Sequence, residues 1–147
     1  MARYRCTIET ALSPDEAFDY MARFSNAESW DPSVVRASMV TPEPVEKGSI
    51  FEVVVRSLGR ELPFRYEVVE HSRPKRVVLR ARRGSLVSED TVTVRALSVG
   101  GSALTYDADL RMEGPLRLLD PLLGLVFQRL GCNAEAGLRR ELPAPTP

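Results

Sequence analysis

Few side chains in this 147-residue sequence have the type and position that acid–base chemistry needs. Asp90 lies in an alternating segment, and the residues in phase with it, Leu86, Ser88, Val92 and Val94, are largely apolar. We therefore expect its carboxyl group to point toward the inside of the fold. A carboxyl group in a dry pocket has a raised pKa and can act as an acid or hydrogen-bond a ligand hydroxyl. The alternative is a charge at a strand edge, paired with a neighbouring arginine.

The other candidates for catalysis favour simpler interpretations. His71, the single histidine, is in phase with Arg65 and Glu67, so we expect a solvent-facing turn residue and not a general base. Asp107 and Asp109 alternate with apolar residues and are expected to face water. No serine lies in a G-x-S-x-G motif, which argues against a serine triad. The sequence therefore contains no catalytic motif, and the catalytic residues stay unassigned.

Large aromatic side chains supply the remaining candidates for a binding site. Those expected to point into the fold are Phe18, Trp30, Phe51, Phe64, Tyr66, Tyr106 and Phe127. Each is compatible with a simple core position, but as a set they are typical of an apolar cavity with a few hydroxyl groups. We expect at least two of them to line such a cavity, where Tyr66 and Tyr106 can offer hydroxyls to a ligand. With Asp90, these are the ligand-cavity candidates.

The charge balance excludes several classes of partner. Twenty basic and twenty acidic residues give a formal net charge of zero, which removes the electrostatic reason for nucleic-acid or anionic-membrane binding. The basic run over 75–83 alternates like a strand, with Glu67 and Glu70 as counter-charges. One histidine and two cysteines exclude most metal sites, so we expect no metal and no cofactor. Cys6 and Cys132 are expected to be two buried, reduced thiols.

The elements that must position these residues begin with a strand over 4–11, where apolar and polar residues alternate. Ser13-Pro14-Asp15-Glu16 then has an N-cap serine, a proline at the first helical position and acidic residues in the first turn. This predicts a helix from Ser13 to Arg23. A second, very short helix is expected over Ser25–Trp30, ended by Asp31-Pro32.

The middle of the sequence alternates with period 2 between turn signals. It predicts six strands, over Val34–Val40, Ser49–Leu58, Glu61–Ser72, Arg76–Arg83, Ser85–Leu97 and Ser102–Met112. Short connections make successive strands antiparallel, so with the first strand they form a seven-stranded meander. The strands are long, and the sheet is therefore expected to be strongly curved.

A helix is predicted from Leu116 to Glu141, with Pro121 and Gly124 marking a kink or a two-part start. Its apolar stripe consists of Leu123, Val126, Phe127, Leu130, Ala134 and Leu138. A single helix cannot fill the concave side of a curved sheet, so a space is expected between them. Residues 143–147 are expected to be a disordered, proline-rich tail.

The segment Leu116–Leu125 contains more leucines than one buried face needs. Either Leu118, Leu122 and Leu125 cover a neighbouring loop, or they form an exposed patch that serves as a cavity gate, a homodimer contact or a membrane-touching lip. The segment is too short and too charged to span a bilayer, so no stable membrane insertion is expected. The N-terminus lacks the apolar run of a secretory signal, which favours a cytoplasmic location.

Five segments of the sequence resemble the polyketide cyclase/dehydrase family of the START-like, helix-grip (SRPBCC) superfamily. They are 13–20 (SPDEAFDY), 24–33 (FSNAESWDPS), 48–53 (GSIFEV), 101–106 (GSALTY) and 114–119 (GPLRLL). The resemblance covers about residues 3–142. It implies an α+β helix-grip fold, in which a seven-stranded curved antiparallel sheet wraps around a long C-terminal helix. It also implies two short helices between strands one and two and a single domain over residues 1–142.

What the resemblance implies about function is a cavity between sheet and helix that binds a hydrophobic small molecule, such as a lipid, a polyketide or an aromatic metabolite. The alternative is a cyclase/dehydrase-type enzyme in which Asp90, Tyr66 and Tyr106 are acid–base or orienting groups. A third interpretation is a scaffold whose leucine-rich segment docks a partner. The superfamily contains carriers, receptors and enzymes, so the fold does not choose among them.

Overall fold

The computed structural model describes residues 2–145, with only the backbone described for 117 and 119–123. The elements follow the predicted order and lie within a few residues of the predicted bounds. They are β1 (Ala2–Thr10), α1 (Pro14–Ala22), the 3-10 turn η1 (Phe24–Asn26), α2 (Ala27–Trp30), β2 (Val34–Met39), β3 (Ile50–Ser57), β4 (Arg60–Ser72), β5 (Arg76–Arg83), β6 (Leu86–Ala96), β7 (Ser102–Met112), the 3-10 segment η2 (Gly114–Leu119) and α3 (Asp120–Glu141). The 3-10 segment η2 leads directly into α3, so the C-terminal helix has the expected two-part start.

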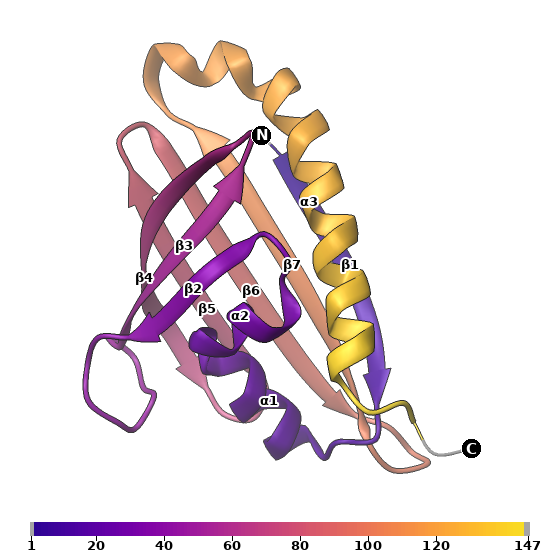
Figure 1. The fold of residues 1–147 in the computed structure, drawn as a ribbon. Helices are drawn as coiled ribbons and strands as arrows, with labels where there is room; N and C mark the ends of the chain where they lie inside the picture. Colours follow the sequence, from indigo (N-terminus) through magenta and orange to yellow (C-terminus); the bar gives the residue numbers. More distant parts are fainter. Residues whose placement is uncertain (1, 146–147) are drawn as a thin grey trace.

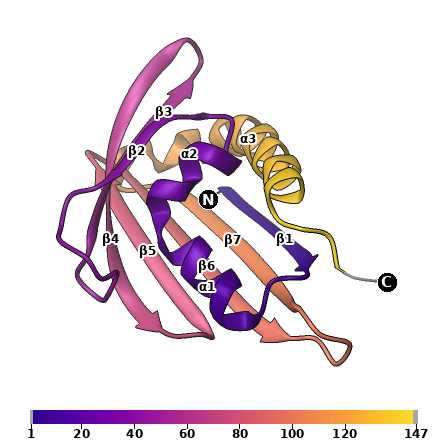
Figure 2. The same ribbon diagram turned by 60° about the horizontal axis from the view of Figure 1, so that its bottom comes forward.

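The seven strands form one antiparallel sheet in the order β1-β7-β6-β5-β4-β3-β2. The sheet is strongly curved, and α3 lies along β1 on its concave side (Figure 1). The two short helices lie on the same side, across one end of the sheet (Figure 2). The predicted helix-grip architecture is therefore confirmed.

The first helix begins as its sequence predicts, with a capping box at Ser13. The Ser13 hydroxyl accepts a hydrogen bond from the Glu16 amide, and the Glu16 carboxylate accepts one from the Ser13 amide. A cap of this kind stabilises a helix by about 0.5–2 kcal/mol. One face of α1 packs against the sheet and buries Ala17, Phe18 and Met21.

A β-bulge in β4 corrects one prediction. The register between β4 and β5 shifts between Val68 and Glu70, so that His71 pairs with Val77. Val77 is buried in the core, and the shift therefore turns His71 to the concave face. The His71 ring is half-buried and lies edge-on to the ring of Phe18, with centroids 5.2 Å apart. The expectation of a solvent-facing turn residue is wrong because an extra residue inverts the alternation.

Two glycines allow α3 to approach its neighbours closely. A Cβ atom at Gly131 would lie 2.2 Å from the ring of Tyr4 on β1. A Cβ atom at Gly137 would lie 1.7 Å from the backbone oxygen of Trp30 at the end of α2. Real Cβ atoms do not tolerate such distances. The positions of α3 against β1 and against α2 therefore depend on these two glycines.

The C-terminal segment and the cysteines refine the remaining expectations. The Pro143 carbonyl accepts hydrogen bonds from the Ala11 amide, at 3.1 Å, and from the Thr10 hydroxyl, at 2.7 Å. The expected tail therefore begins with an anchored residue, and 146–147 lie outside the described residues. Both cysteines are free, but only Cys6 is buried. Because α3 turns Cys132 to its exposed side, the expectation of two buried thiols is wrong.

The basic run over 75–83 is an ordinary charged sheet face. Arg76 pairs with Glu70 at 3.0 Å, as expected. Arg80 pairs with Glu89 of β6 at 2.8 Å and not with a residue of the preceding strand. Within the described part of the chain, no helix is both long and apolar enough to cross a membrane.

Candidate functional site

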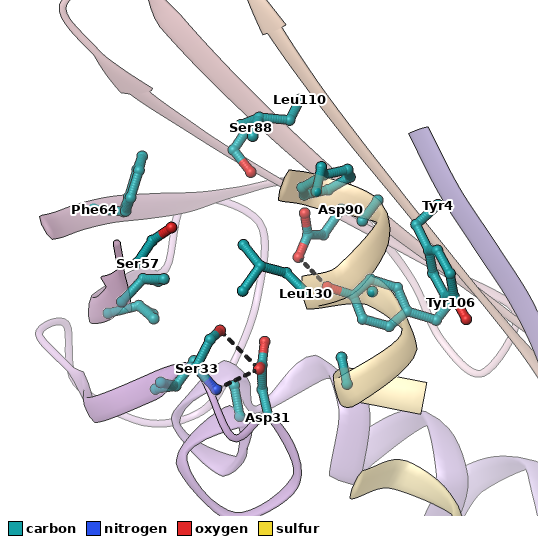
Figure 3. Close-up of a pocket in the computed structure, with 18 of the residues that line it drawn as sticks. Tyr4, Asp31, Ser33, Ser57, Phe64, Ser88, Asp90, Tyr106, Leu110 and Leu130 are labelled. Atoms are coloured by element: carbon teal, nitrogen blue, oxygen red, sulfur yellow. Dashed lines mark hydrogen bonds between the residues drawn. The ribbon is translucent and has the colours of Figure 1, made fainter. Parts of the chain in front are cut away.

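A cavity of about 160 Å³ lies between the concave face of the sheet and α3. Its walls are mostly apolar and come from α3, from the segment that runs from η1 through α2 into β2, and from β1, β3, β4, β6 and β7 (Figure 3). Polar atoms enter it at a few positions only, chiefly Asp31, Tyr66, Ser88, Asp90 and Tyr106. An apolar enclosure with a few converging polar groups is the usual form of a small-molecule site.

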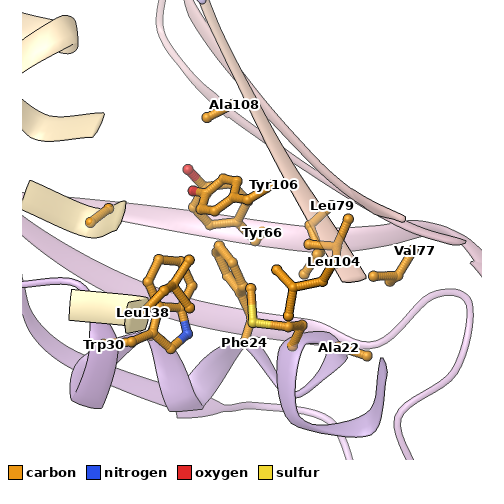
Figure 4. Close-up of a cluster of buried hydrophobic side chains, with 14 of the residues drawn as sticks. Ala22, Phe24, Trp30, Tyr66, Val77, Leu79, Leu104, Tyr106, Ala108 and Leu138 are labelled. Atoms are coloured by element: carbon orange, nitrogen blue, oxygen red, sulfur yellow. The ribbon is translucent and has the colours of Figure 1, made fainter. Parts of the chain in front are cut away.

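The sequence-derived candidates divide into two groups. Phe64, Tyr66, Asp90, Tyr106 and Phe127 line the cavity. Phe18, Trp30 and Phe51 do not line it: they are buried in the packed core beneath α1 and α2. The Trp30 ring lies edge-on to that of Tyr106, with centroids 5.2 Å apart (Figure 4). Trp30 therefore supports the cavity residue Tyr106 from the core side. All three are core residues because the two short helices cover that end of the sheet.

Asp90 is the most unusual group in the cavity. It lies in β6, with Leu79 of β5 and Ala108 of β7 as its register partners, and is only 4% exposed. Its pKa is raised to about 7, chiefly by burial and in part by the negative charges of Asp31, Glu89 and Asp107, against the lowering effect of a hydrogen bond from Tyr106. The alternative of a strand-edge charge paired with an arginine is wrong, since β6 is an internal strand.

Two tyrosines place their hydroxyls beside this carboxyl group. Tyr106 donates a hydrogen bond to Asp90 Oδ2 at 2.7 Å, and the Tyr66 hydroxyl lies 2.7 Å from Ser88 Oγ. Burial, together with the negative charge of Asp90, raises the pKa of both phenols well above 10. Both tyrosines are therefore neutral hydrogen-bonding groups across the physiological pH range and do not act as bases.

Sequence analysis missed a second carboxyl group in the cavity, that of Asp31. Its Oδ1 accepts hydrogen bonds from the Ser33 amide at 2.9 Å and the Ser33 hydroxyl at 2.8 Å, while burial raises its pKa (Figure 3). In the sequence, Asp31-Pro32 predicts the end of a helix and 31–33 belongs to a segment of family resemblance, but neither assigns a role to the Asp31 carboxyl group. An aspartate followed two residues later by serine also indicates a local turn that fixes a carboxyl group in place.

Tyr4 and Glu135 were also missed, at the side of the cavity where α3 crosses β1. The Tyr4 hydroxyl donates to Glu135 Oε1 at 2.5 Å, and Arg139 pairs with the other carboxylate oxygen at 2.9 Å. The hydrogen bond from Tyr4, followed by that from Arg139, lowers the pKa of Glu135. Glu135 is thus an ionised group whose charge is already balanced. It follows Ala134 of the apolar stripe, so the stripe itself gave no signal for it.

The cavity contains few groups for covalent or metal chemistry. Cys6 lines it, but burial raises the pKa of its thiol to about 11, which makes it a poor nucleophile. Among the described residues, no three His, Cys, Asp or Glu side chains gather as a metal ion would require. What the site offers is a buried carboxyl group that titrates near neutrality, neutral hydroxyl donors and apolar surface.

A second, shallower groove of about 380 Å³ adjoins the cavity and shares Ser57, Val126 and Leu130 with it. The groove lies between the β3–β4 turn and α3, and its walls carry Arg56 and Arg129. In the neighbouring leucine-rich segment, Leu118 is 82% and Leu125 is 75% exposed. These two side chains do not cover a loop, which leaves the exposed-patch interpretation for them. The side chain of Leu122 lies outside the described residues.

Comparison with known proteins connects this chain to a family. A family model described as polyketide cyclase/dehydrase and lipid transport matches residues 1–141. No curated protein matches the chain.

Similar solved structures include a START superfamily protein from Mycobacterium smegmatis, with 14% identity, 97% of both chains covered and a TM-score of 0.77. The protein TTHA0849 from Thermus thermophilus has 15% identity, 95% and 94% coverage and a TM-score of 0.72. The di-domain ARO/CYC StfQ of the steffimycin biosynthetic pathway has 16% identity and a TM-score of 0.67, with 94% of this chain and 48% of that chain covered. At these identities the likeness shows the shared fold.

Proposed function

We propose, since the chain belongs to the polyketide cyclase/dehydrase and lipid transport family, that it binds a hydrophobic small molecule between the sheet and α3. The observation that carries the proposal is the cavity of about 160 Å³, with apolar walls and a buried carboxyl and hydroxyl cluster at one side. Binding is driven by apolar burial, at about 25 cal/mol per Å² before ordering costs. Lipids, polyketides and aromatic metabolites are the ligand classes that the family suggests.

The volume of the cavity limits what fits without rearrangement. An engineered protein cavity of about 150 Å³ holds one benzene molecule. The present cavity, of about 160 Å³, therefore matches one aromatic ring or a short chain. A multi-ring polyketide or a two-chain lipid requires α3 or the adjoining groove to open.

Mass spectrometry of the freshly purified protein, native against denatured, tests whether a small molecule co-purifies. Calorimetric titration with toluene, a neutral probe of one aromatic ring, provides a second measurement. Ala108→Phe, which projects a ring into the cavity, is expected to reduce probe binding at least tenfold. Ala96→Phe, at the exposed end of β6, is the matched control and leaves binding unchanged. Equal probe binding by both variants, with both folded, contradicts the proposal.

An enzyme of the cyclase/dehydrase type is the second candidate, and the Asp90–Tyr106 pair favours it. A carboxyl group with a pKa of about 7, hydrogen-bonded to a phenol inside an apolar cavity, suits proton transfer to or from a bound carbonyl compound. If the chain catalyses an aldol-type ring closure of a poly-β-carbonyl substrate, turnover can be followed by the change in substrate absorbance. Asp90→Asn and Tyr66→Phe are then expected to abolish turnover but leave probe binding intact. Unchanged turnover in both variants eliminates these residues as acid–base groups.

A further inference from the structure

The charges that face the cavity are all of one sign. Among the described residues that line it, Asp31, Asp90 and Glu135 carry carboxyl groups, and none is lysine, arginine or histidine. Glu135 already pairs with Arg139, whereas neither Asp31 nor Asp90 forms an ion pair with any described residue. The cavity therefore contains a buried carboxyl group, that of Asp90, and a half-buried one, that of Asp31, and neither has a cation beside it.

Asp90 has unused capacity directed at this space. Its Oδ2 accepts the hydrogen bond from Tyr106, while no other described group bonds to Oδ1, and the side chain lines the cavity (Figure 3). A carboxylate buried without a cation is costly, and a cation brought beside it removes much of that cost. A carboxylate ligand placed here would instead add a third uncompensated charge.

Aromatic rings line the same cavity as the carboxyl groups. Phe24, Phe64, Tyr66, Tyr106 and Phe127 all line the cavity. The faces of such rings attract cations, and rings combined with an acidic group are a common way to bind an ammonium ion. Cations that could meet an anionic head group, Arg56 and Arg129, lie in the adjoining groove and do not line the cavity.

We propose that the ligand of this cavity is a small hydrophobic amine of about one ring, bound as its ammonium ion with Asp90 as the counter-ion. The inference rests on the proposed function, because it specifies the class of molecule that the cavity takes up. It differs from a general apolar pocket in one measurable way: the head group decides affinity, in the order ammonium, neutral hydroxyl, carboxylate.

Proton linkage gives the proposal a second signature. The ammonium ion pairs with ionised Asp90, whose pKa of about 7 in the empty cavity means that the ionised fraction grows as the pH rises. Amine affinity is therefore expected to rise about tenfold per pH unit below 7 and to level off above it. The other groups around Asp90 are Tyr106, Tyr66 and Asp31, with Glu89 and Asp107 as further nearby charges. The two phenols do not titrate in this range.

Calorimetric titration with benzylamine, benzyl alcohol and benzoate tests the inference, because the three share one ring and one carbon. Benzylamine is expected to bind at least tenfold more tightly than benzyl alcohol at about pH 8, and benzoate more weakly than both. Asp90→Asn removes the preference for the amine and changes alcohol binding less than threefold. Asp19→Asn, on the surface of α1 and paired with Arg73, is the matched control and keeps the preference.

The outcomes separate the two proposals. If benzyl alcohol binds and benzylamine binds no more tightly, or its affinity is flat between about pH 5.5 and about pH 8, the amine inference is overturned while cavity binding stands. If none of the three binds and toluene also fails to bind, the proposed function is overturned with it. The comparison of the three molecules uses the unaltered protein, so it does not depend on the folding of a variant.

Discussion

The concave face of the sheet has two ends that differ in how they are filled, although the same strands build both. On β6, Val92 is packed in the core while Asp90 faces the cavity, and on β7 the same division separates Leu104 from Tyr106 and Ala108. The difference comes from what covers the sheet. At one end α1 and α2 close it, and at the other only α3 crosses it (Figure 1). Inward-facing residues become core or cavity according to the element above them.

The difference teaches where polar groups are tolerated. The closed end is dominated by large apolar side chains such as Phe18, Phe51 and Leu104. The open end holds the carboxyl groups of Asp31 and Asp90, which a fully packed core would not accept without partners. A fold that needs stability alone gains nothing from this arrangement, so the open end is where function is expected.

The largest contrast is expected from the glycines of α3. Gly137→Ala forces a methyl group against the Trp30 backbone oxygen at the closed end and is expected to cost more than about 3 kcal/mol, beyond the usual range for overpacking. At Gly124, near the open end, an added Cβ atom meets no atom within 4 Å. Gly124→Ala is therefore expected to raise the free energy of unfolding by as much as about 1 kcal/mol, because alanine has the higher helix propensity. Urea unfolding measures both. Similar changes in the two variants would mean that α3 does not press on α2.

A second contrast uses two leucines of β7. Leu104→Ala removes a fully buried side chain at the closed end, with an expected loss of about 2–5 kcal/mol. Leu110→Ala removes a half-buried side chain that already borders empty space, with an expected loss of about 1 kcal/mol or less. Thermal unfolding followed by circular dichroism checks the pair. Equal losses would show that the two ends are packed alike.

The pH dependence of stability sharpens the comparison further. Asp90 has a pKa of about 7 in the fold against about 3.9 in the unfolded chain, so unfolding releases its proton between these values. Its contribution therefore favours folding below about pH 4 and is lost as the pH rises to 7. Asp90→Asn is expected to be more stable than the natural protein at pH 8, by on the order of 2–4 kcal/mol, with the difference vanishing near pH 4. A pH-independent difference contradicts the assignment.

Much of this organisation could be predicted from local sequence. The alternation of apolar and polar residues, together with the turn residues, predicted the seven strands. The apolar residues in phase with Asp90 in β6 predicted that its side chain points inward. Both predictions succeed because they depend only on residues close in sequence. The inversion at His71 could not be predicted, since one extra residue in β4 changes the face without changing the pattern. The sequence also could not predict that Phe18, Trp30 and Phe51 lie in the core and not in the cavity, because this depends on where helices distant in sequence cross the sheet.

The smallest effect on stability is expected outside the cavity, on the leucine-rich segment at the open end. Leu118 and Leu125 are exposed, and a homodimer contact through 116–125 would give these side chains a partner. The double variant Leu118→Ser/Leu125→Ser is expected to unfold within about 0.5 kcal/mol of the natural protein, because neither side chain is packed. Light scattering is expected to show a dimer for the natural protein and a monomer for the variant.

The matched control for this contact is Val99→Ser, which alters an equally exposed apolar residue (83%) in the β6–β7 turn at the closed end. It is expected to leave the dimer intact, because the β6–β7 turn lies at the far end of the sheet from η2 (Figure 1). A natural protein that scatters as a monomer eliminates the dimer contact. If the dimer survives the double leucine variant but not Val99→Ser, the interface lies at the closed end of the sheet. The prediction that the leucine-rich segment at the open end forms the dimer contact is then wrong.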